Sequence, residues 1–404
     1  MKQTYILTLV VMSTVVAGCT TSNTNSADTN TNTTINRTVD VPTEDTNDSS
    51  EADAAVTAYF YQIVGPFING SGNNSVRVGK TNDGMTVDSY QPDDSGNVLE
   101  WTQGANHSYA YGDPVFSRLA SGSWIMTARS SSADPRGANR LLYAESSCPL
   151  VDDDTVVAIS PSSASGCKPV NALTQGKTSQ VFTDDEGRNL VFSMISGDIY
   201  LTYLSDASQS ATALDSVCVL QQPVASMDEL ELGSATSIFT DQQIGNLLLS
   251  DTAIARRSDI DGTWALFVKG IPNDLGCTDR SLCELCARSI YRTTSTDLIH
   301  WTDLELVVEQ ASVPEATTTP DGNVWLYWQD FSNTCDAGDE KLSAQSPISG
   351  AYEQAGSNEL SDKVTVSFPD EEFEGDDKLH YATNGNPVTL PDAQAQAALE
   401  ACFN

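Results

Sequence analysis

From Tyr59 onward, the chain alternates short segments rich in Val, Ile, Leu, Tyr, Phe and Trp with turns rich in Gly, Asp, Asn and Pro. Short apolar segments bounded by turn residues are typical of β-strands. No long segment before the C-terminal tail repeats its apolar residues at helical spacing. The pattern predicts an all-β domain over residues 56–391. The clearest predicted strands are 75–79, 123–128, 189–194, 199–203, 263–269 and 323–328.

The tail, residues 392–404, has a different pattern. It is short and amphipathic, and Asp392 stands where a side chain can cap the start of a helix. Cys402 lies near its end. We therefore expect a short C-terminal helix that a disulfide from Cys402 would pin to the domain.

One hairpin motif recurs along the domain. Each copy is a strand, a Gly-containing turn and a return strand, led by Trp in three of the four copies. The copies occupy residues 113–128, 179–193, 251–268 and 315–328. Their spacing of roughly 65 to 70 residues suits a four-stranded blade with its loops. The repeat predicts a β-propeller of five blades, with six smaller blades as the alternative.

These copies, together with the strings VPEATTTPDGNVWLYW and STDLIHW, resemble the five-bladed propeller glycoside hydrolases of the arabinanase/xylosidase type and related sialidase-like propellers. The resemblance covers most of residues 75–345 as a pattern. Residues 81–84 and 295–301 are similar to the sialidase Asp-box, a structural turn outside the active site. They indicate the fold and not sialidase activity.

Three copies of the motif open with an acidic residue. Glycoside hydrolysis needs two carboxyl groups on either side of the scissile bond, and a third can tune the acid. The resembled hydrolases use Asp, Asp and Glu in this order, each at the start of an inner strand. The resemblance implies Asp113 as the base, Asp251 as the residue that tunes the pKa of the acid, and Glu315 as the general acid. The remaining copy has Gln180 instead, and the alternative for each acid is an ordinary turn residue.

The charge of the chain narrows the choice of ligand. It has 20 Lys and Arg against 55 Asp and Glu, a net charge of −35. Such a surface repels nucleic acid and anionic sugars alike. Arg118, Arg129, Arg256 and Arg257 do not give three equivalent positions for a sugar carboxylate. We expect a neutral glycan or cell-surface ligand, hydrolysed or, as the alternative, held by a non-catalytic propeller that binds glycan or protein.

The N-terminus reads as an export signal. Residues 1–18 have one cation, Lys2, and an apolar run too short to cross a bilayer as a stable helix. The string Val16-Ala17-Gly18-Cys19 resembles the lipobox of bacterial lipoproteins, which implies acylation of Cys19. Residues 19–55, rich in Thr, Asn and Ser, are expected to form a disordered tether. This predicts a protein of the bacterial cell envelope held to the outer membrane by its lipid anchor alone.

The remaining cysteines suit an oxidising compartment. Eight of them allow up to four disulfides. They are Cys148, Cys167, Cys218, Cys277, Cys283, Cys286, Cys335 and Cys402. The spacing of residues 277, 283 and 286 also admits zinc. No metal or cofactor is predicted; the acidic runs 152–154, 184–186 and 370–372 allow calcium as an alternative to solvated turns.

Overall fold

A computed structural model describes residues 58–66, 75–91, 100–102, 112–119, 121–129, 141–149, 156–158, 180–184, 189–195, 198–204, 218–220, 238–257, 262–277, 281–298, 300–338, 347–354, 357, 359–369, 380–390 and 392–403. All of them belong to one compact unit, Ala52–Asn404. The predicted signal, lipobox, tether and Cys167 lie outside these residues, as do the acidic residues 152–154, 185–186 and 370–372. No described helix is both long and apolar enough to cross a membrane.

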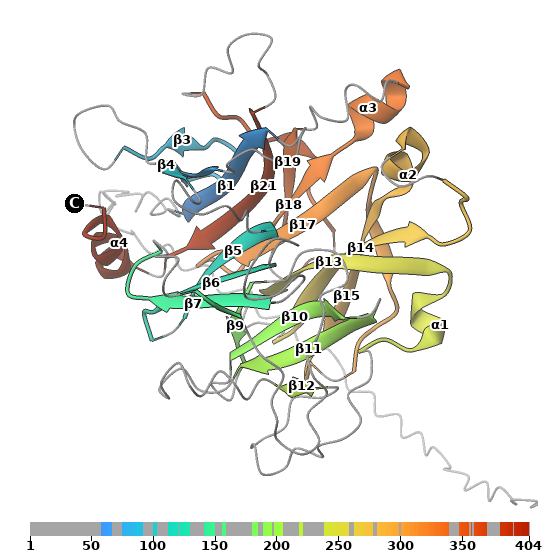
Figure 1. Ribbon diagram of the computed structural model, residues 1–404, viewed down its shortest axis with the longest axis horizontal. Coiled ribbons are helices and arrows are strands. Elements are labelled where there is room, and N and C mark those ends of the chain that lie inside the picture. The colour runs from blue at the N-terminus through green and yellow to red at the C-terminus, as the bar shows by residue number, and fades with distance from the viewer. Residues whose placement is uncertain are drawn as a thin grey trace, which may run out of the picture. The chain divides into compact units, whose positions relative to one another are not determined.

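The described strands pair antiparallel into five sheets (Figure 1). Sheet 1 contains β21 (His380–Thr389), β1 (Ala58–Pro66), β2 (Ser75–Thr81) and β3 (Asp88–Ser89), with β4 (Glu100–Thr102) also paired to β2. Sheet 2 contains β5 (Gly112–Arg118), β6 (Trp124–Arg129), β7 (Leu141–Ser146) and β8 (Val157–Ala158). Sheet 3 contains β9 (Phe182–Thr183), β10 (Asn189–Ile195), β11 (Asp198–Leu204) and β12 (Cys218–Leu220).

Sheet 4 contains β13 (Leu247–Arg256), β14 (Trp264–Pro272), β15 (Ser289–Ser295) and β16 (Glu305–Glu309). Sheet 5 contains β17 (Ala311–Thr318), β18 (Val324–Asp330), β19 (Ile348–Glu353) and β20 (Val364–Thr365). The chain is mostly β in a propeller arrangement, and the predicted strands are present. Sheets 2 to 5 have the four-stranded order of a propeller blade. Sheet 1 has the additional strand β4, so the count of five blades stays a prediction.

One edge strand in each of four sheets meets an edge strand of a neighbouring sheet: β13 contacts β17, β17 contacts β21, and β21 contacts β5. The contacts include their C-terminal ends, because Thr318 Oγ1 donates a hydrogen bond to the carbonyl of Arg256 and Thr389 Oγ1 donates to the carbonyl of Thr318 at 2.7 Å. The C-terminal ends of β13, β17 and β21 therefore lie at the same end of their sheets. Sheet 3 contacts β13 through β10, which is not an edge strand.

The apolar run of β18 is buried on both faces. Val324, Leu326 and Trp328 belong to the cluster that sheet 5 shares with sheet 4, whereas Trp325 and Tyr327 pack against sheet 1. Alternate residues of a strand point to opposite faces, so a strand between two sheets is apolar throughout. The Trp residues of the hairpin motif are accordingly buried between sheets and do not offer exposed faces to a sugar; they are Trp124, Trp264, Trp325 and Trp328.

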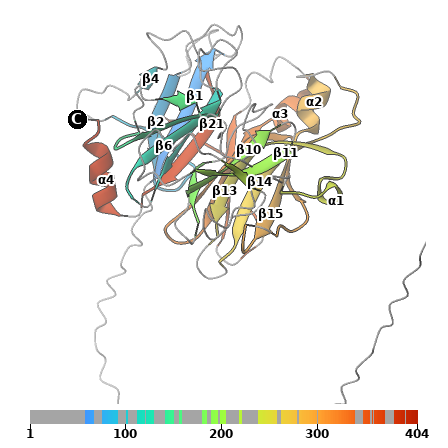
Figure 2. The ribbon, with the colours of Figure 1, turned by 60° about the horizontal axis from the view of Figure 1, so that its bottom comes forward.

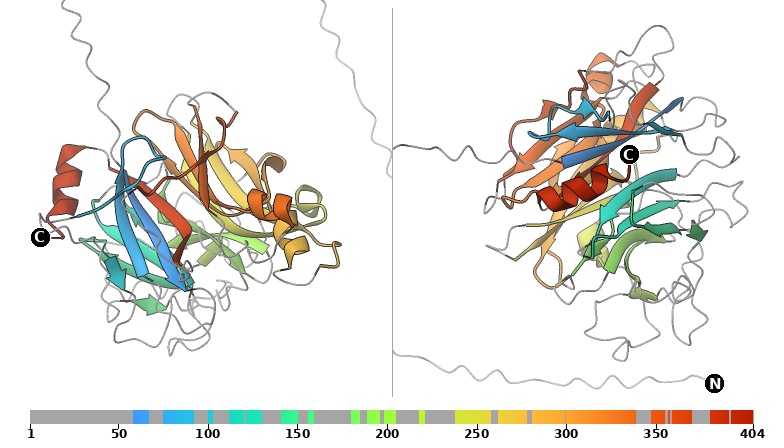
Figure 3. Two further views of the ribbon diagram at one scale, coloured as in Figure 1. Left: turned by 90° about the horizontal axis from the view of Figure 1, so that it is seen from above. Right: turned by 90° about the vertical axis from the view of Figure 1, so that its left-hand side faces the viewer.

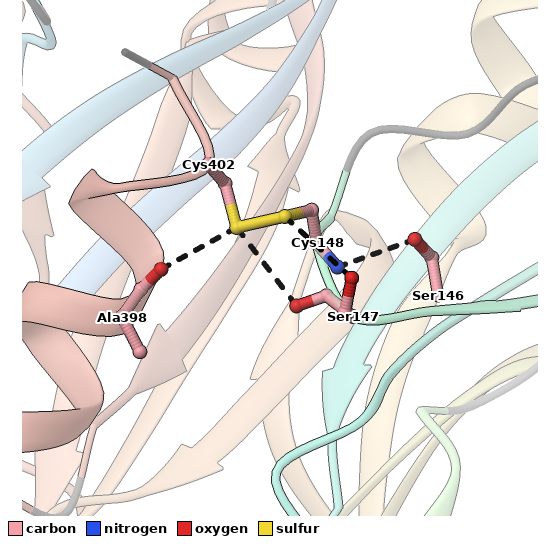
Figure 4. Close-up of a disulfide and its surroundings, with 5 residues drawn as sticks. All are labelled: Ser146, Ser147, Cys148, Ala398 and Cys402. Atoms are coloured by element: carbon pink, nitrogen blue, oxygen red, sulfur yellow. Dashed lines mark hydrogen bonds between the residues drawn. A yellow bond between two sulfur atoms is a disulfide. The ribbon is translucent and has the colours of Figure 1, made fainter.

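The predicted C-terminal helix is present as α4 (Ala393–Glu400). The Asp392 carboxylate caps it by accepting a hydrogen bond from the Ala395 amide at 2.8 Å. Leu399 packs into the core shared by sheets 1 and 2, alongside which the helix lies in Figure 3. The disulfide Cys148–Cys402 then ties the tail to the end of β7 (Figure 4).

The described part of the chain also contains three short helices that the sequence pattern did not predict. They are α1 (Asp241–Ile244), α2 (Leu282–Ala287) and α3 (Ser332–Ala337). Each is too short to show a helical period of apolar residues. Side chains of Thr240 and Ser281 cap α1 and α2. The three helices lie in loops of a domain that remains mostly β, and the absence of any long helical period before the tail is consistent with their length.

A buried charge cluster links sheets 4 and 5. Glu353, on β19, forms ion pairs with Arg257 and, at 2.6 Å, with Arg292 of β15. The Glu353 side chain is 1% exposed and that of Arg292 is 3% exposed. Burial alone would lower the pKa of Arg292, but Glu305 and Glu353 raise it above its usual value. The cluster thus joins the two sheets through buried charges, and removal of either partner would leave the other uncompensated.

We expect Glu353→Ala to lower the free energy of unfolding by about 3 to 5 kcal/mol, because two guanidinium groups lose a buried counter-charge. Denaturant unfolding measures this change. Glu305→Ala is the matched control, since Glu305 pairs with the same Arg292 at 2.7 Å but is 64% exposed. The control should cost less than about 1 kcal/mol. Equal losses in the two variants would contradict the assignment.

Candidate functional site

The predicted acids of sheets 4 and 5 lie at β-bulges. In β13, the pairing register with β14 shifts between Ser250 and Thr252, and Asp251 is the extra residue. In β17, the register with β18 shifts between Ser312 and Glu315. Bulges re-aim side chains and are frequent next to active sites. Asp251 thus lies within its bulge, whereas Glu315 is the first regularly paired residue after a bulge in the neighbouring edge strand.

The sequence placed these acids at the first residue of each inner strand, and this placement was wrong. β13 begins at Leu247 and β17 at Ala311, so each strand starts before its acid and is interrupted beside it. In β5, the register with β6 shifts between Gly112 and Val115, and Asp113 lies in this interval. Nothing is described of the Asp113 side chain. The register thus places Asp113 and Asp251 within bulges and Glu315 directly after one.

The backbone at these bulges adopts an uncommon conformation. Asp251 has a φ of 47° and Val313, within the bulge of β17, has a φ of 51°. Residues other than glycine rarely occupy this left-handed region, and a β-branched residue such as Val does so least readily. Such strained positions cluster at functional sites. The strain is an independent sign that the two bulges serve more than packing.

Asp251 is 4% exposed and pairs with a cation. The ammonium of Lys269, on β14, forms an ion pair with Asp251 Oδ2. Ser250 Oγ lies 3.3 Å from the same oxygen and donates a hydrogen bond to it. Lys269 is 12% exposed and pairs directly with Ser250 in the β-ladder. The bulge brings the carboxylate to this ammonium.

Glu315 is 1% exposed, the deepest of the acids predicted to be catalytic whose side chain is described. It stands opposite Tyr327 of β18, just beyond the bulge. Charged side chains are almost never so buried without a specific reason. Because β13 and β17 contact each other, Asp251 and Glu315 come from adjoining strands.

Two loop helices lie at the end of sheets 4 and 5 where β13 and β17 begin. The ladder pairs Pro272 with Leu247 and Asp330 with Ala311, so the connections that carry α2 and α3 leave from the end where β13 and β17 begin. α2 and α3 lie beside each other (Figure 2). The disulfide Cys286–Cys335 links them.

Asp330 anchors the start of α3. It accepts hydrogen bonds from the Ser332 amide at 2.9 Å and from Ser349 Oγ at 2.8 Å, and it pairs with Lys363 at 2.9 Å. Burial raises the pKa of Asp330, but the hydrogen bonds from Lys363, Ser332 and Ser349 outweigh it and hold that pKa below its usual value. Asp330 therefore serves as a structural anion at the end of the sheets where β17 begins.

The cysteines in and around α2 and α3 form two disulfides, Cys277–Cys283 and Cys286–Cys335. The zinc alternative for residues 277, 283 and 286 is thereby contradicted. The described residues contain no cluster of side chains suited to a metal ion.

The arginines considered for a sugar carboxylate have other roles. Arg257 pairs with Glu353, and the Arg256 guanidinium lies over the ring of Trp264 at 5.3 Å. Arg118 ends β5, and the side chain of Arg129 is not described. The described arginines do not form a carboxylate clamp.

The Asp-box-like segments form turns. The Asp83 carboxylate accepts hydrogen bonds from the amides of Met85 and Thr86 at 2.8 and 2.7 Å. The Asp297 carboxylate accepts one from the His300 amide at 2.8 Å. These turns connect β2 to β3 and β15 to β16, so their role is local structure.

Sequence reasoning missed Lys269 and Arg288. Lys269 follows the apolar run of β14, where a cation interrupts a strand that is otherwise buried. That interruption was a usable signal, although its partner could not be read from the sequence. Arg288 ends α2, a helix that the pattern did not reveal.

Comparison with known proteins gives likenesses in structure only. No protein-family model matches the chain. No curated protein matches it either. Among solved structures it is similar to an exo-β-1,3-galactanase from Clostridium thermocellum, with 14% identity and a TM-score of 0.45 over 77% of this chain and 61% of that one.

Two further solved structures are similar at lower TM-scores. An α-L-arabinanase from Penicillium chrysogenum in complex with arabinobiose has 14% identity and a TM-score of 0.36, over 62% of each chain. An α-L-arabinofuranosidase from Podospora anserina in complex with cellotriose has 12% identity and a TM-score of 0.37, over 66% of this chain and 71% of that one. The chain spans less than two thirds of the length of the galactanase and the arabinanase. Likeness at this level concerns the fold.

We expect Lys269→Met to lower the free energy of unfolding by about 3 to 5 kcal/mol, because Asp251 becomes a buried anion without its cation. Adding Asp251→Asn should recover most of this loss, since the double variant has no buried charge at the bulge. Urea unfolding of the wild type, both single variants and the double variant measures the coupling. A double variant no more stable than Lys269→Met would contradict the ion pair.

Proposed function

We propose that the chain is a propeller glycoside hydrolase that cleaves a neutral glycan with paired carboxyl groups. The observation that carries this proposal is the burial of two acids beside bulges of the adjoining strands β13 and β17, Asp251 within one bulge and Glu315 directly after the other. Two carboxyl groups in different surroundings are what acid–base cleavage of a glycosidic bond requires.

Glu315 is assigned the role of general acid. A general acid must hold its proton until the leaving oxygen needs it, and withdrawal from water favours the neutral form of a carboxyl group. Glu315 is the more buried of the two described acids. Asp113, at the bulge of β5, is assigned the role of the base that activates water.

Asp251 is assigned a positioning role rather than the tuning role that the resemblance implied. Lys269 offsets its charge, so the pair has little net field to act on a neighbouring acid. A carboxylate held by an ammonium and a hydroxyl can still accept hydrogen bonds from sugar hydroxyl groups. It would orient the sugar against Glu315.

The choice of a neutral glycan rests on charge. With a net charge of −35, the chain repels anionic sugars unless cations compensate locally. The described cations near the acids, Lys269 and Arg288, are already paired with Asp251 and Glu284.

The five sheets are proposed to be the five blades of one propeller, with β21 and β1 closing the ring. The protein would be exported and held to the bacterial outer membrane by acyl chains on Cys19, beyond a tether of residues 19–55. Its partners would then be glycans at the cell surface, with no nucleic acid among them.

The alternative function is binding without catalysis, of a glycan or a protein. The observation that favours it is the Lys269–Asp251 ion pair, which holds one of the three predicted catalytic carboxylates in a structural contact. Binding and hydrolysis place different demands on Glu315, and one experiment separates them.

That experiment offers neutral polysaccharides to the wild type and to Glu315→Gln, and measures both binding and release of reducing ends. We expect the wild type to cleave at least one of them. Glu315→Gln should bind that polysaccharide within a few-fold of the wild type but cleave it at least about 100-fold more slowly, because it has no proton to give.

Glu309→Gln, an exposed glutamate on β16, is the matched control and should retain full activity. Undiminished cleavage by Glu315→Gln would remove Glu315 as the acid. Binding without cleavage by the wild type would replace the hydrolase proposal by the binding function.

A further inference from the structure

The start of β17 is held by residues from two loop helices. Arg288, which ends α2, accepts a hydrogen bond at its carbonyl from the Ala311 amide at 3.0 Å. Its guanidinium donates to Ser312 Oγ at 3.4 Å. From the other side, the amide of Phe331, which precedes α3, donates to the carbonyl of Gln310 at 2.8 Å. The segment entering the bulge therefore contacts both helices.

Arg288 is itself fixed in place. It forms two hydrogen bonds to Glu284 within α2, at 2.9 and 2.8 Å, a bidentate pair that sets the plane of the guanidinium. The same group lies 5.8 Å from the centre of the Phe331 ring, within the range of a cation–π contact. The arginine thus joins α2, the residue before α3, and β17.

The disulfide Cys286–Cys335 completes this arrangement. It joins α2 to α3 across a sequence separation of 49 residues, and thus sheet 4 to sheet 5. Ser312 is fully buried and is the last regularly paired residue before the bulge, and Glu315 is the first one after it. Contacts that hold Ser312 in place therefore also hold the start of the bulge, and with it the backbone that leads to Glu315.

We propose that α2 and α3, joined by Cys286–Cys335, act through Arg288 as a clamp that sets the position of the Glu315 carboxyl group. Arg288 is a positioning residue in this proposal, because it acts through Ser312. The consequence for catalysis rests on the proposed function, whereas the clamp itself is a property of the fold. Loss of the clamp would move Glu315 without unfolding the sheets, and small displacements of reacting groups reduce turnover strongly.

The test compares two paired cysteine variants on the same helix. Cys286→Ala/Cys335→Ala removes the bond between α2 and α3. Cys277→Ala/Cys283→Ala is the matched control, because that bond closes a loop of sequence separation 6 beside α2 and does not reach α3. Amide hydrogen exchange of peptides covering residues 310–316 measures how well the amides at the start of β17 are protected from solvent, and it needs no substrate.

We expect exchange over 310–316 to be at least about tenfold faster in Cys286→Ala/Cys335→Ala than in the wild type, with residues 264–268 of β14 unchanged. The control should match the wild type over 310–316. Arg288→Met should reproduce the faster exchange with the disulfide intact, and Arg288→Lys should reproduce part of it, since Lys lacks the fork that reaches Glu284 and Ser312 together. Unchanged exchange in both Cys286→Ala/Cys335→Ala and Arg288→Met would overturn the clamp.

Turnover then tests the link to Glu315. On a polysaccharide that the wild type cleaves, Arg288→Met should lower kcat by about 10- to 100-fold with little change in KM. Faster exchange with unchanged kcat would overturn the effect on Glu315. Absence of cleavage by the wild type would refute the proposed function, while the exchange result would still decide whether the clamp exists.

Discussion

The structure depends on matching the charges that it withdraws from water. An ion pair gains little at a protein surface, but removal of one partner from a buried pair leaves a charge that the interior cannot solvate. Glu353 is matched by Arg257 and Arg292, Asp251 by Lys269, and Asp330 by Lys363, Ser332 and Ser349. Three of these contacts, Glu353–Arg292, Asp251–Lys269 and Asp330–Ser349, join two strands and therefore also fix how those strands lie.

This changes the meaning of the acidic composition. A chain with 20 cations and 55 acids cannot pair most of its carboxylates, and most of them must face water. Several of the described cations lie instead beside buried acids: Arg257 and Arg292 beside Glu353, Lys269 beside Asp251, and Lys363 beside Asp330. Scarcity of Lys and Arg therefore concentrates the electrostatic contribution to stability at a small number of positions, and most of the negative surface affects only which partners approach.

The sequence was sufficient for the elements whose residues carry their own pattern. The strand 324–330 could be read from VWLYW because a short apolar run and the turn residues before it are local, and the tail helix because Asp392 caps it and Cys402 follows. α1, α2 and α3 escaped because four to six residues cannot show a helical period. The bulges escaped for another reason: register is a relation between two strands, and neither strand encodes it alone.

The same distinction applies to the site. Asp251 and Glu315 were predicted because each opens a copy of a repeated hairpin, which is visible in one sequence. Lys269 and Arg288 were missed because their roles exist only through contacts with residues 18 and 24 positions away in the chain, made across a ladder or between helices. A sequence repeat shows which positions correspond between copies. The surroundings of corresponding positions differ because of contacts with distant residues, which the repeat does not show.

Those differences bear on how one repeated unit can supply different chemical roles. β13 and β17 each place an acid within or directly after a bulge, yet one meets the ammonium of Lys269 and the other follows a segment held by two crosslinked helices. Two carboxyl groups in identical surroundings would compete for the same role, whereas different surroundings separate their roles. Loop insertions such as α2 and α3 lie outside the repeated hairpin. They can change the surroundings of the acid in one copy while leaving the sheets intact. Divergence of roles within a symmetric fold is therefore expected to arise from the loops and from single cations on adjacent strands.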